Sequence, residues 1–349
     1  MKTNATRHAR LGLRLRRHAL VAVALVSQAL ALSLTPSALA QTPPPDYGLD
    51  FVTVGAAGNR ASLVSEMPDY QITAGAVGHD FRITRTEVLV QDWLPFVRAY
   101  APYWEGTPWD SRLTSVFISP DGQGGFITDP FFERAPVSVP WHMAARYVNW
   151  LHNDRAPHRA AFESGVYDTS TFSQNPDGTW NDQVAHTPGS RYWIPTFDET
   201  FKAFYYDPHR YGDGLDGYWM YPNRSNTPPV AGPPGIGETN VGNGTFGAYM
   251  QSGLYPHVTT PWGLLDASGG AIEWTESLYS EHYRTRYYIG TAAATSPEWI
   301  PLLDRADRFH FGTAPVSLYG FRVASLIPSP ASSLLLCLVA CFMQKRNRQ

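Results

Sequence analysis

The segment Arg191-Tyr192-Trp193-Ile194-Pro195-Thr196 leads directly into Phe197-Asp198-Glu199. Thr196 and Glu199 are three positions apart, which is the spacing of a capping box, in which each side chain bonds the backbone N–H of the other residue. The pattern predicts a helix that starts at Thr196 and continues through Lys202. Glu199 also has the chemistry of a general base, but its capping position favours a structural role.

Other regular elements are expected to be short and widely separated. Residues 49–54 are typical of a first strand, and residues 80–88 alternate before a helical stretch at 90–100. A second helix is expected to begin at Ser138, with Pro140 tolerated in its first turn. These elements are too few to make a helical bundle.

Long segments between these elements lack periodicity. The glycine-rich run Asp121-Gly122-Gln123-Gly124-Gly125 follows a proline and predicts a hairpin turn rather than a phosphate cradle. Residues 205–254 show almost no period, and residues 228–244 are expected to form a long loop. Loops of this length in a compact domain are usually functional or stabilised by an ion.

Several collinear blocks of the chain carry a resemblance to a known family. They include Leu49-Asp50-Phe51-Val52, Glu87-Val88, Ala144-Ala145-Arg146-Tyr147, Arg191-Tyr192-Trp193-Ile194-Pro195-Thr196, Tyr218-Trp219, Leu265-Asp266, Glu273-Trp274 and Gly320-Phe321-Arg322-Val323-Ala324-Ser325. In this order they resemble the formylglycine-generating enzyme, or sulfatase-modifying factor, family over roughly residues 49–325. The resemblance implies an irregular α+β fold, related to C-type lectin-like domains, with little regular secondary structure and structural calcium.

One departure from the family pattern bears on chemistry. Enzymes of the family that oxidise a sulfatase cysteine use a copper-binding cysteine pair between a Gly-Gly-Ser segment and the closing Gly-Phe-Arg. The corresponding stretch here, residues 287–319, contains no cysteine, and the Gly-Gly-Ser segment is reduced to Ile289-Gly290-Thr291. Copper(I) requires soft thiolate donors. We therefore expect no copper and no formylglycine formation by the known route.

Calcium is the cofactor that the resemblance implies. It places a ligand at Glu273, with Gly270 where an asparagine usually shares the role, and oxygen donors from irregular loops suit a hard cation. Solvated turns are the alternative interpretation of the polar loop residues. The expected calcium ligands are Glu273, Asp266, Gly269, Asp213, Asp216 and Asn223.

Aromatic loop residues suggest a ligand class. A lectin-like fold with aromatic-rich loops would stack rings on sugars, so an extracellular polysaccharide is the expected ligand. The candidate stacking residues are Trp219, Tyr221, Trp262 and Trp274.

The N-terminal residues have the pattern of a secretory signal peptide. Basic residues precede an apolar stretch at 19–34, and Ala38-Leu39-Ala40 forms a small-residue cleavage site. A membrane anchor is the alternative, but Ser27 and Gln28 interrupt a stretch already shorter than the roughly 20 apolar residues of a span. Export is therefore expected.

The C-terminal residues resemble a PEP-CTERM sorting signal, which exosortase systems process in Gram-negative bacteria. Pro328-Ser329-Pro330 precedes a mostly apolar run and the basic cluster Lys345, Arg346 and Arg348. Ser329 stands where the signal usually has glutamate, and an ordinary tail anchor is the alternative. Both cysteines of the chain, Cys337 and Cys341, lie in this tail, so the rest of the chain has no thiol.

The composition excludes one class of partner. The formal net charge is −3, and lysine occurs only at positions 2, 202 and 345, so no basic patch is available to follow a phosphate backbone. No nucleic acid is therefore expected as a partner.

Together these features predict four parts: a signal peptide at 1–40, a linker at 41–48, a sulfatase-modifying-factor-like domain at 49–326 and a sorting tail at 328–349. The expected function is an exported, envelope-associated binding or structural module that uses exosortase-type machinery and transient membrane association. The alternative is an oxidoreductase of the same family that uses unrecognised residues.

Overall fold

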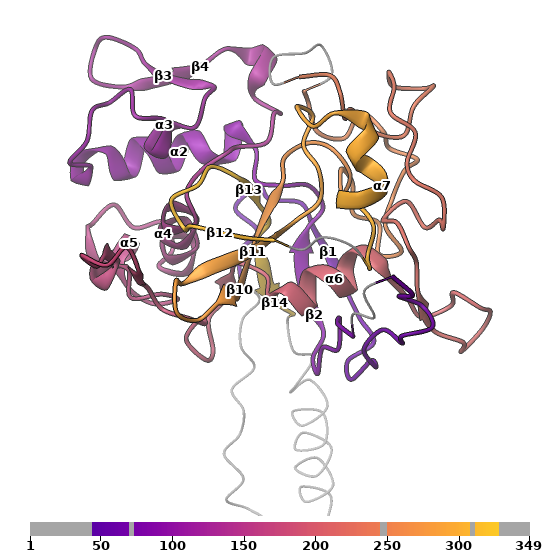
Figure 1. Ribbon diagram of the computed structural model, residues 1–349. Helices are drawn as coiled ribbons and strands as arrows, with labels where there is room; N and C mark the ends of the chain where they lie inside the picture. The colour runs from indigo at the N-terminus through magenta and orange to yellow at the C-terminus, as the bar shows by residue number, and fades with distance from the viewer. Residues whose placement is uncertain (1–43, 70–72, 245–249, 308–310, 328–349) are drawn as a thin grey trace, which may run out of the picture. The chain divides into compact units, whose positions relative to one another are not determined.

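Two four-stranded sheets organise the chain, and the first combines strands from both ends of the domain (Figure 1). The computed structural model describes residues 44–69, 73–244, 250–307 and 311–327, which lie in the unit Pro43–Ile327. The first sheet has the order β1-β2-β14-β7 and is antiparallel throughout. Its strands are β1 (Phe51–Val54), β2 (Phe81–Thr84), β14 (Ala324–Leu326) and β7 (Tyr192–Trp193).

The second sheet has the order β12-β11-β10-β13 and contains one parallel pair, β10 with β13. Its strands are β10 (Glu273–Ser280), β11 (Thr285–Ile289), β12 (Gly312–Thr313) and β13 (Gly320–Phe321). Because β13 and β14 are separated only by Arg322 and Val323, the chain passes from the second sheet to the first within two residues.

The remaining elements are mostly short. The longer helices are α2 (Val90–Tyr100), α4 (Trp141–His152) and α6 (Phe197–Tyr205). Short helices are α3 (Ser111–Thr114), α5 (Ala160–Glu163) and α7 (Ile300–Leu303), with 3-10 turns η2 (Ala101–Tyr103), η3 (Pro130–Phe132), η4 (Thr169–Thr171) and η5 (Pro297–Trp299). Three hairpins pair β3 (Ile118–Pro120) with β4 (Phe126–Thr128), β5 (Ser173–Gln174) with β6 (Trp180–Asn181), and β8 (Tyr206–Asp207) with β9 (Gly217–Tyr218).

An aromatic cluster packs helices α2 and α4 against the sheets. The Trp93 ring centroid lies 4.5 Å from that of Phe96, 5.3 Å from that of Tyr147 and 6.0 Å from that of Phe321. All four side chains are buried. Large rings bury much apolar area per residue and pack edge to face, so a few short elements suffice to close this core.

Several local predictions are confirmed. Helix α2 has the predicted bounds, and the Thr196–Glu199 capping box forms, with Glu199 N donating to Thr196 Oγ1 and Thr196 N donating to Glu199 Oε2. The glycine-rich run forms the turn between β3 and β4, where Asp121 accepts hydrogen bonds from the backbone N–H of Gln123 and Gly125. The irregular α+β fold with little regular secondary structure is also as expected.

The predicted start of the second helix is wrong. Helix α4 begins at Trp141 with Pro140 as its N-cap, not at Ser138. Val139 instead forms a bridge with Tyr319, donating to its carbonyl oxygen at 2.8 Å. This pairing with a distant segment holds the preceding residues extended, and the helix starts only after it.

The terminal predictions lie outside the described residues. The expected signal peptide, the whole sorting tail at 328–349 and residues 41–43 of the linker are not among them. Within the described ranges, no helix combines the length and the hydropathy that crossing a membrane requires.

Candidate functional site

A buried ion pair joins the two sheets. Arg322 donates from Nε and from Nη2 to different oxygens of Glu273, each at 2.9 Å, and the two residues are 1% and 2% exposed. Its other N–H groups donate to the backbone oxygens of Thr84, Arg85 and Leu265 at 3.2, 2.6 and 2.8 Å. Every guanidinium N–H therefore has an acceptor, which is the condition for burying such a charge.

Two further carboxyl groups, Glu87 and Asp266, belong to the same electrostatic cluster. Glu87 Oε1 accepts from Ala271 N at 3.0 Å, while Oε2 is buried and has no hydrogen-bond partner in the described part of the chain. Asp266 Oδ2 accepts from Gly253 N at 2.7 Å. Burial raises the pKa of all three carboxyl groups, and the guanidinium opposes that rise. Arg322 acts on all three groups, and Arg134 adds a second positive charge near Asp266. Burial still outweighs these charges, so the cluster retains protons at pH values where exposed carboxyl groups have lost theirs.

The geometry explains why glycine occupies position 270. A Cβ atom there would lie 2.0 Å from Glu87 Oε1, and the backbone φ is +58°. The side-chain amide of Asn240 lies beside this glycine, and its Oδ1 accepts from Gly270 N at 2.9 Å. Sequence reasoning missed Asn240, which lies in an aperiodic loop, and Glu87, which stood in one of the family-like blocks.

The six expected calcium ligands do not form one site. Glu273 and Asp266 belong to the carboxylate cluster, and Gly269 lies in the adjoining loop. Asp216 instead accepts from Arg60 Nε at 3.1 Å, and the Asp213 side chain is fully exposed. Among the residues that the structure describes, no group of three or more His, Cys, Asp and Glu side chains is arranged to hold a metal ion.

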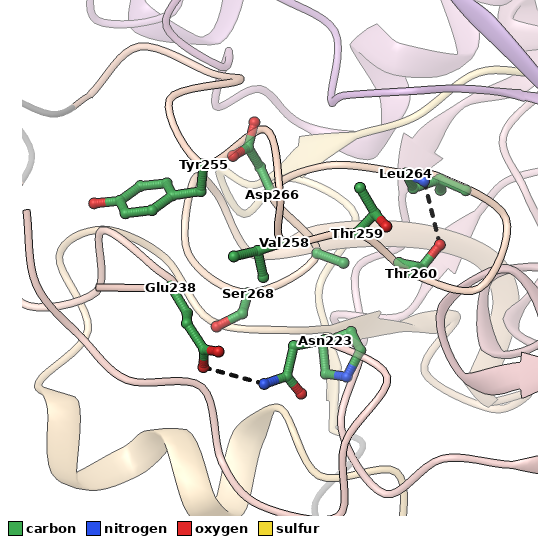
Figure 2. Close-up of a pocket in the computed structure, with 11 residues that line it drawn as sticks. Asn223, Glu238, Tyr255, Val258, Thr259, Thr260, Leu264, Asp266 and Ser268 are labelled. Carbon is green, nitrogen blue, oxygen red and sulfur yellow. Dashed lines mark hydrogen bonds between the residues drawn. The ribbon is translucent and has the colours of Figure 1, made fainter. Parts of the chain in front are cut away.

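Asn223, the sixth expected ligand, lines a separate small cavity of about 10 Å³ (Figure 2). Its Nδ2 donates to Glu238 Oε2 at 3.2 Å, and its Oδ1 is buried without a hydrogen-bond partner in the described ranges. Asp266 also lines this cavity, but its carboxylate points away from the Asn223–Glu238 pair. The cavity has room for about one water molecule.

A buried acid lies behind this cavity. Ser268, which lines it, donates to Asp304 Oδ2 at 2.5 Å, and Thr291 Oγ1 donates to the same oxygen at 3.0 Å. Asp304 is 0% exposed, and burial raises its pKa to about 7, although both hydrogen bonds act to lower it. Burial therefore favours the protonated form of Asp304.

Two of the four candidate stacking residues are core residues. Trp274 is 1% exposed and donates from Nε1 to the Val139 carbonyl at 2.9 Å, and Tyr221 is 4% exposed. Their rings cannot stack on an external sugar in this arrangement. Tertiary packing decides their burial, which no local pattern reveals.

The other two candidate stacking residues are partly exposed but already have partners. The Arg210 guanidinium lies 4.2 Å from the Trp219 ring centroid, and Trp219 Nε1 donates to Asp207. The Trp262 ring stacks on Tyr206 at 6.4 Å. Trp219 thus has both a ring contact and a hydrogen bond, whereas the buried Trp262 Nε1 has no hydrogen-bond partner among the described residues.

The two ends of the stretch without cysteine meet at a cavity of about 170 Å³. Ala292, Ala293 and Ala294 line it from one end, and Leu318 and Tyr319 from the other. Tyr319 is the only lining residue with a titratable side chain, and burial raises its pKa. The walls are therefore mostly apolar and offer no thiolate.

The raised pKa of Asp304 predicts a pH-dependent stability. Its folded pKa is about 7, above the ordinary value of about 3.9, so the native protein binds more protons than the unfolded chain between these values. The free energy of unfolding should therefore fall as pH rises through this window, with a slope of up to about 1.4 kcal/mol per unit from this group. Asp304→Asn should lack that slope in urea denaturation, whereas exposed Asp213→Asn should keep it. Parallel curves for wild type and Asp304→Asn would contradict the assignment.

Three solved structures are similar to this chain at low sequence identity. CarF is 17% identical, with a TM-score of 0.45 over 80% of this chain and 99% of its own. Treponema denticola variable protein 1 is 16% identical, with a TM-score of 0.45 over 79% and 94% of the two chains. PvdO from Pseudomonas aeruginosa is 16% identical, with a TM-score of 0.44 over 79% and 94%. Similarity at this level carries no argument about activity.

The family match is more extensive. No curated protein matches the sequence. The family described as the Sulfatase-modifying factor enzyme 1-like domain matches residues 51–327, which include every element described above. The chain therefore belongs to the sulfatase-modifying factor family.

Proposed function

We propose that this chain is an exported, envelope-associated member of the family that acts as a binding or structural module and does not form formylglycine. The observation that carries the proposal is the cavity of about 170 Å³ at the two ends of the stretch without cysteine. Alanines 292–294 and Leu318 line it, and no lining residue carries a thiol. The resemblance would require the cysteine pair within residues 287–319, which contain none. An extracellular polysaccharide is the ligand class that we propose.

The described domain lacks the thiolate donors that copper(I) requires. A copper(I) site and a thiol relay both need a thiolate, and the cysteines of the chain occur only at 337 and 341, beyond the domain. Oxygen donors of the carboxylate cluster are hard ligands and do not replace a soft one.

The first test is direct. The purified protein, incubated with copper, oxygen and a sulfatase-motif peptide, should leave the peptide cysteine unchanged because no thiolate is available to bind copper(I). Mass spectrometry of the peptide measures the outcome, with an active formylglycine-generating enzyme as the positive control. Formylglycine above the level of a no-protein sample would overturn the proposal and favour the oxidoreductase alternative.

Structural calcium remains a proposal for the carboxylate cluster alone. Three buried carboxyl groups face the Arg322 guanidinium, with Arg134 as a second charge near Asp266. Glu87 Oε2 lacks a hydrogen-bond partner in the described residues. Asp266 and Glu87 would hold the cation, with Glu273 already paired to Arg322. A hard divalent ion would supply the missing positive charge.

This proposal predicts a calcium-dependent melting temperature. A ligand that binds only the native state adds about 2.7 kcal/mol at a hundredfold excess over its dissociation constant. Chelation should lower the melting temperature of the wild type and of Asp213→Asn, which changes an exposed carboxylate. Asp266→Asn keeps an oxygen to accept from Gly253 N but removes a charge, so it should melt at one temperature with and without calcium. Identical wild-type curves with and without chelator would exclude the cation.

The sorting assignment also remains a proposal, because residues 328–349 lie outside the described part. Its support is the order of Pro328-Ser329-Pro330, the apolar run and the basic terminus. Residues 1–40 have the pattern of a signal peptide, which supports export.

Deletion of residues 329–349 should move the protein from the envelope fraction to the periplasm or medium of a Gram-negative host, because the apolar run and its basic anchor are gone. Immunoblots of the separated fractions measure the change. A variant with glutamine at 345, 346 and 348 separates the role of charge from that of the apolar run. If the full-length and shortened proteins fractionate alike, the sorting proposal fails.

A further inference from the structure

A groove that the family resemblance does not assign lies beside helix α2. Its volume is about 580 Å³, within the range of roughly 300–1,000 Å³ that is common for sites of small ligands. One wall comes from the segment after α2, and the other from the β3–β4 hairpin, which lies near α2 and α3 in Figure 1. Its lining includes Arg98, Pro102, Trp104, Pro108, Trp109 and Pro120.

The groove presents two indole rings. Trp109 is 69% exposed and makes no hydrogen bond or ring contact with other described residues. Trp104 is fixed, because its Nε1 donates to the Thr107 carbonyl at 3.1 Å and its ring lies 6.4 Å from that of Tyr100. A Cβ atom at Gly106 would lie 2.5 Å from Trp104 Nε1, so this wall depends on glycine. One indole is held in place, and the other is open to a ligand.

The groove also contains an arginine that makes no direct ion pair with the described residues. Arg98 donates from Nε and Nη2 to the Phe126 carbonyl at 3.1 and 2.7 Å, which holds the guanidinium against the hairpin. Among the described residues no carboxylate lies within ion-pair distance of Arg98. The Asp121 carboxylate, at the hairpin turn, accepts from the backbone N–H of Gln123 and Gly125, each at 2.8 Å, and the Arg98 charge acts on it without a direct ion pair. Arg98 therefore offers a positioned positive charge to an anion.

We propose that this groove binds an anionic polysaccharide that contains uronate sugars. Trp109 stacks on the apolar face of a sugar ring, and Arg98 pairs with its carboxylate. The inference rests on the proposed polysaccharide-binding function and assigns its site to residues other than Trp219 and Trp262.

Two features favour a sugar over an extended peptide. Pro102, Pro108 and Pro120 line the groove and have no backbone N–H, so they cannot donate hydrogen bonds to the main chain of a bound strand. Ring faces and a fixed guanidinium match the faces and carboxylates of a uronate instead. A proline-rich peptide, which needs no such pairing, is the competitor that the experiment must exclude.

The test is calorimetric titration of the purified protein with oligogalacturonate, with a neutral cello-oligosaccharide and with a proline-rich peptide. Oligogalacturonate should bind, and Trp109→Ala should weaken it about tenfold, while Trp299→Ala, which changes another exposed indole outside the groove, should not. Arg98→Gln should weaken oligogalacturonate but not the neutral sugar, and should reduce the salt dependence of binding.

The outcomes separate this inference from the proposed function. Oligogalacturonate binding that survives Trp109→Ala and Arg98→Gln would overturn the groove while leaving a polysaccharide-binding module. Binding of the proline-rich peptide instead of the sugar would overturn the ligand class. Absence of binding to all three probes would also overturn the inference, whereas the non-catalytic proposal is decided only by the formylglycine assay.

Discussion

The fold depends on one buried charge, that of Arg322. The Arg322 residue is only 1% exposed, so water cannot replace a lost hydrogen-bond partner. Each guanidinium N–H therefore needs an acceptor within the protein. The acceptors come from Glu273 in the second sheet and from the backbone at the end of β2 in the first. Removal of one partner of such a pair typically costs about 3–5 kcal/mol, because the other charge remains buried. The two sheets are thus held together by an interaction that tolerates little displacement.

The same cluster shapes the cavity that the proposed function concerns. Ala271 N donates to Glu87, and both Gly270 and Ala271 form part of the cavity wall. The wall is therefore fixed by a hydrogen bond to a buried carboxyl group. This arrangement preserves a rigid pocket even though the residues at 292–294 bring no reactive side chain to it.

Sequence patterns correctly predicted those features that depend on interactions between neighbouring residues. The capping box at Thr196, helix α2 and the turn after β3 each depend on residues within a few positions, and each was found. The start of α4 was misplaced because Val139 pairs with Tyr319, far along the chain. Trp274 and Tyr221 were misassigned for the same reason, since burial is set by distant neighbours. The exposure of Trp109 was not predicted, because no local sequence pattern distinguishes an exposed indole from a buried one.

The position of β14 has a consequence for the order of events during folding. It is the last strand of the domain, yet it lies between β2 and β7, and Ala324 pairs with both Ile83 and Trp193. The first sheet therefore cannot close until the whole domain has been synthesised. Contacts between such distant residues slow folding and leave β2 and β7 without their shared partner in the nascent chain. Until residues 324–326 emerge during synthesis, the domain lacks the strand that joins β2 to β7.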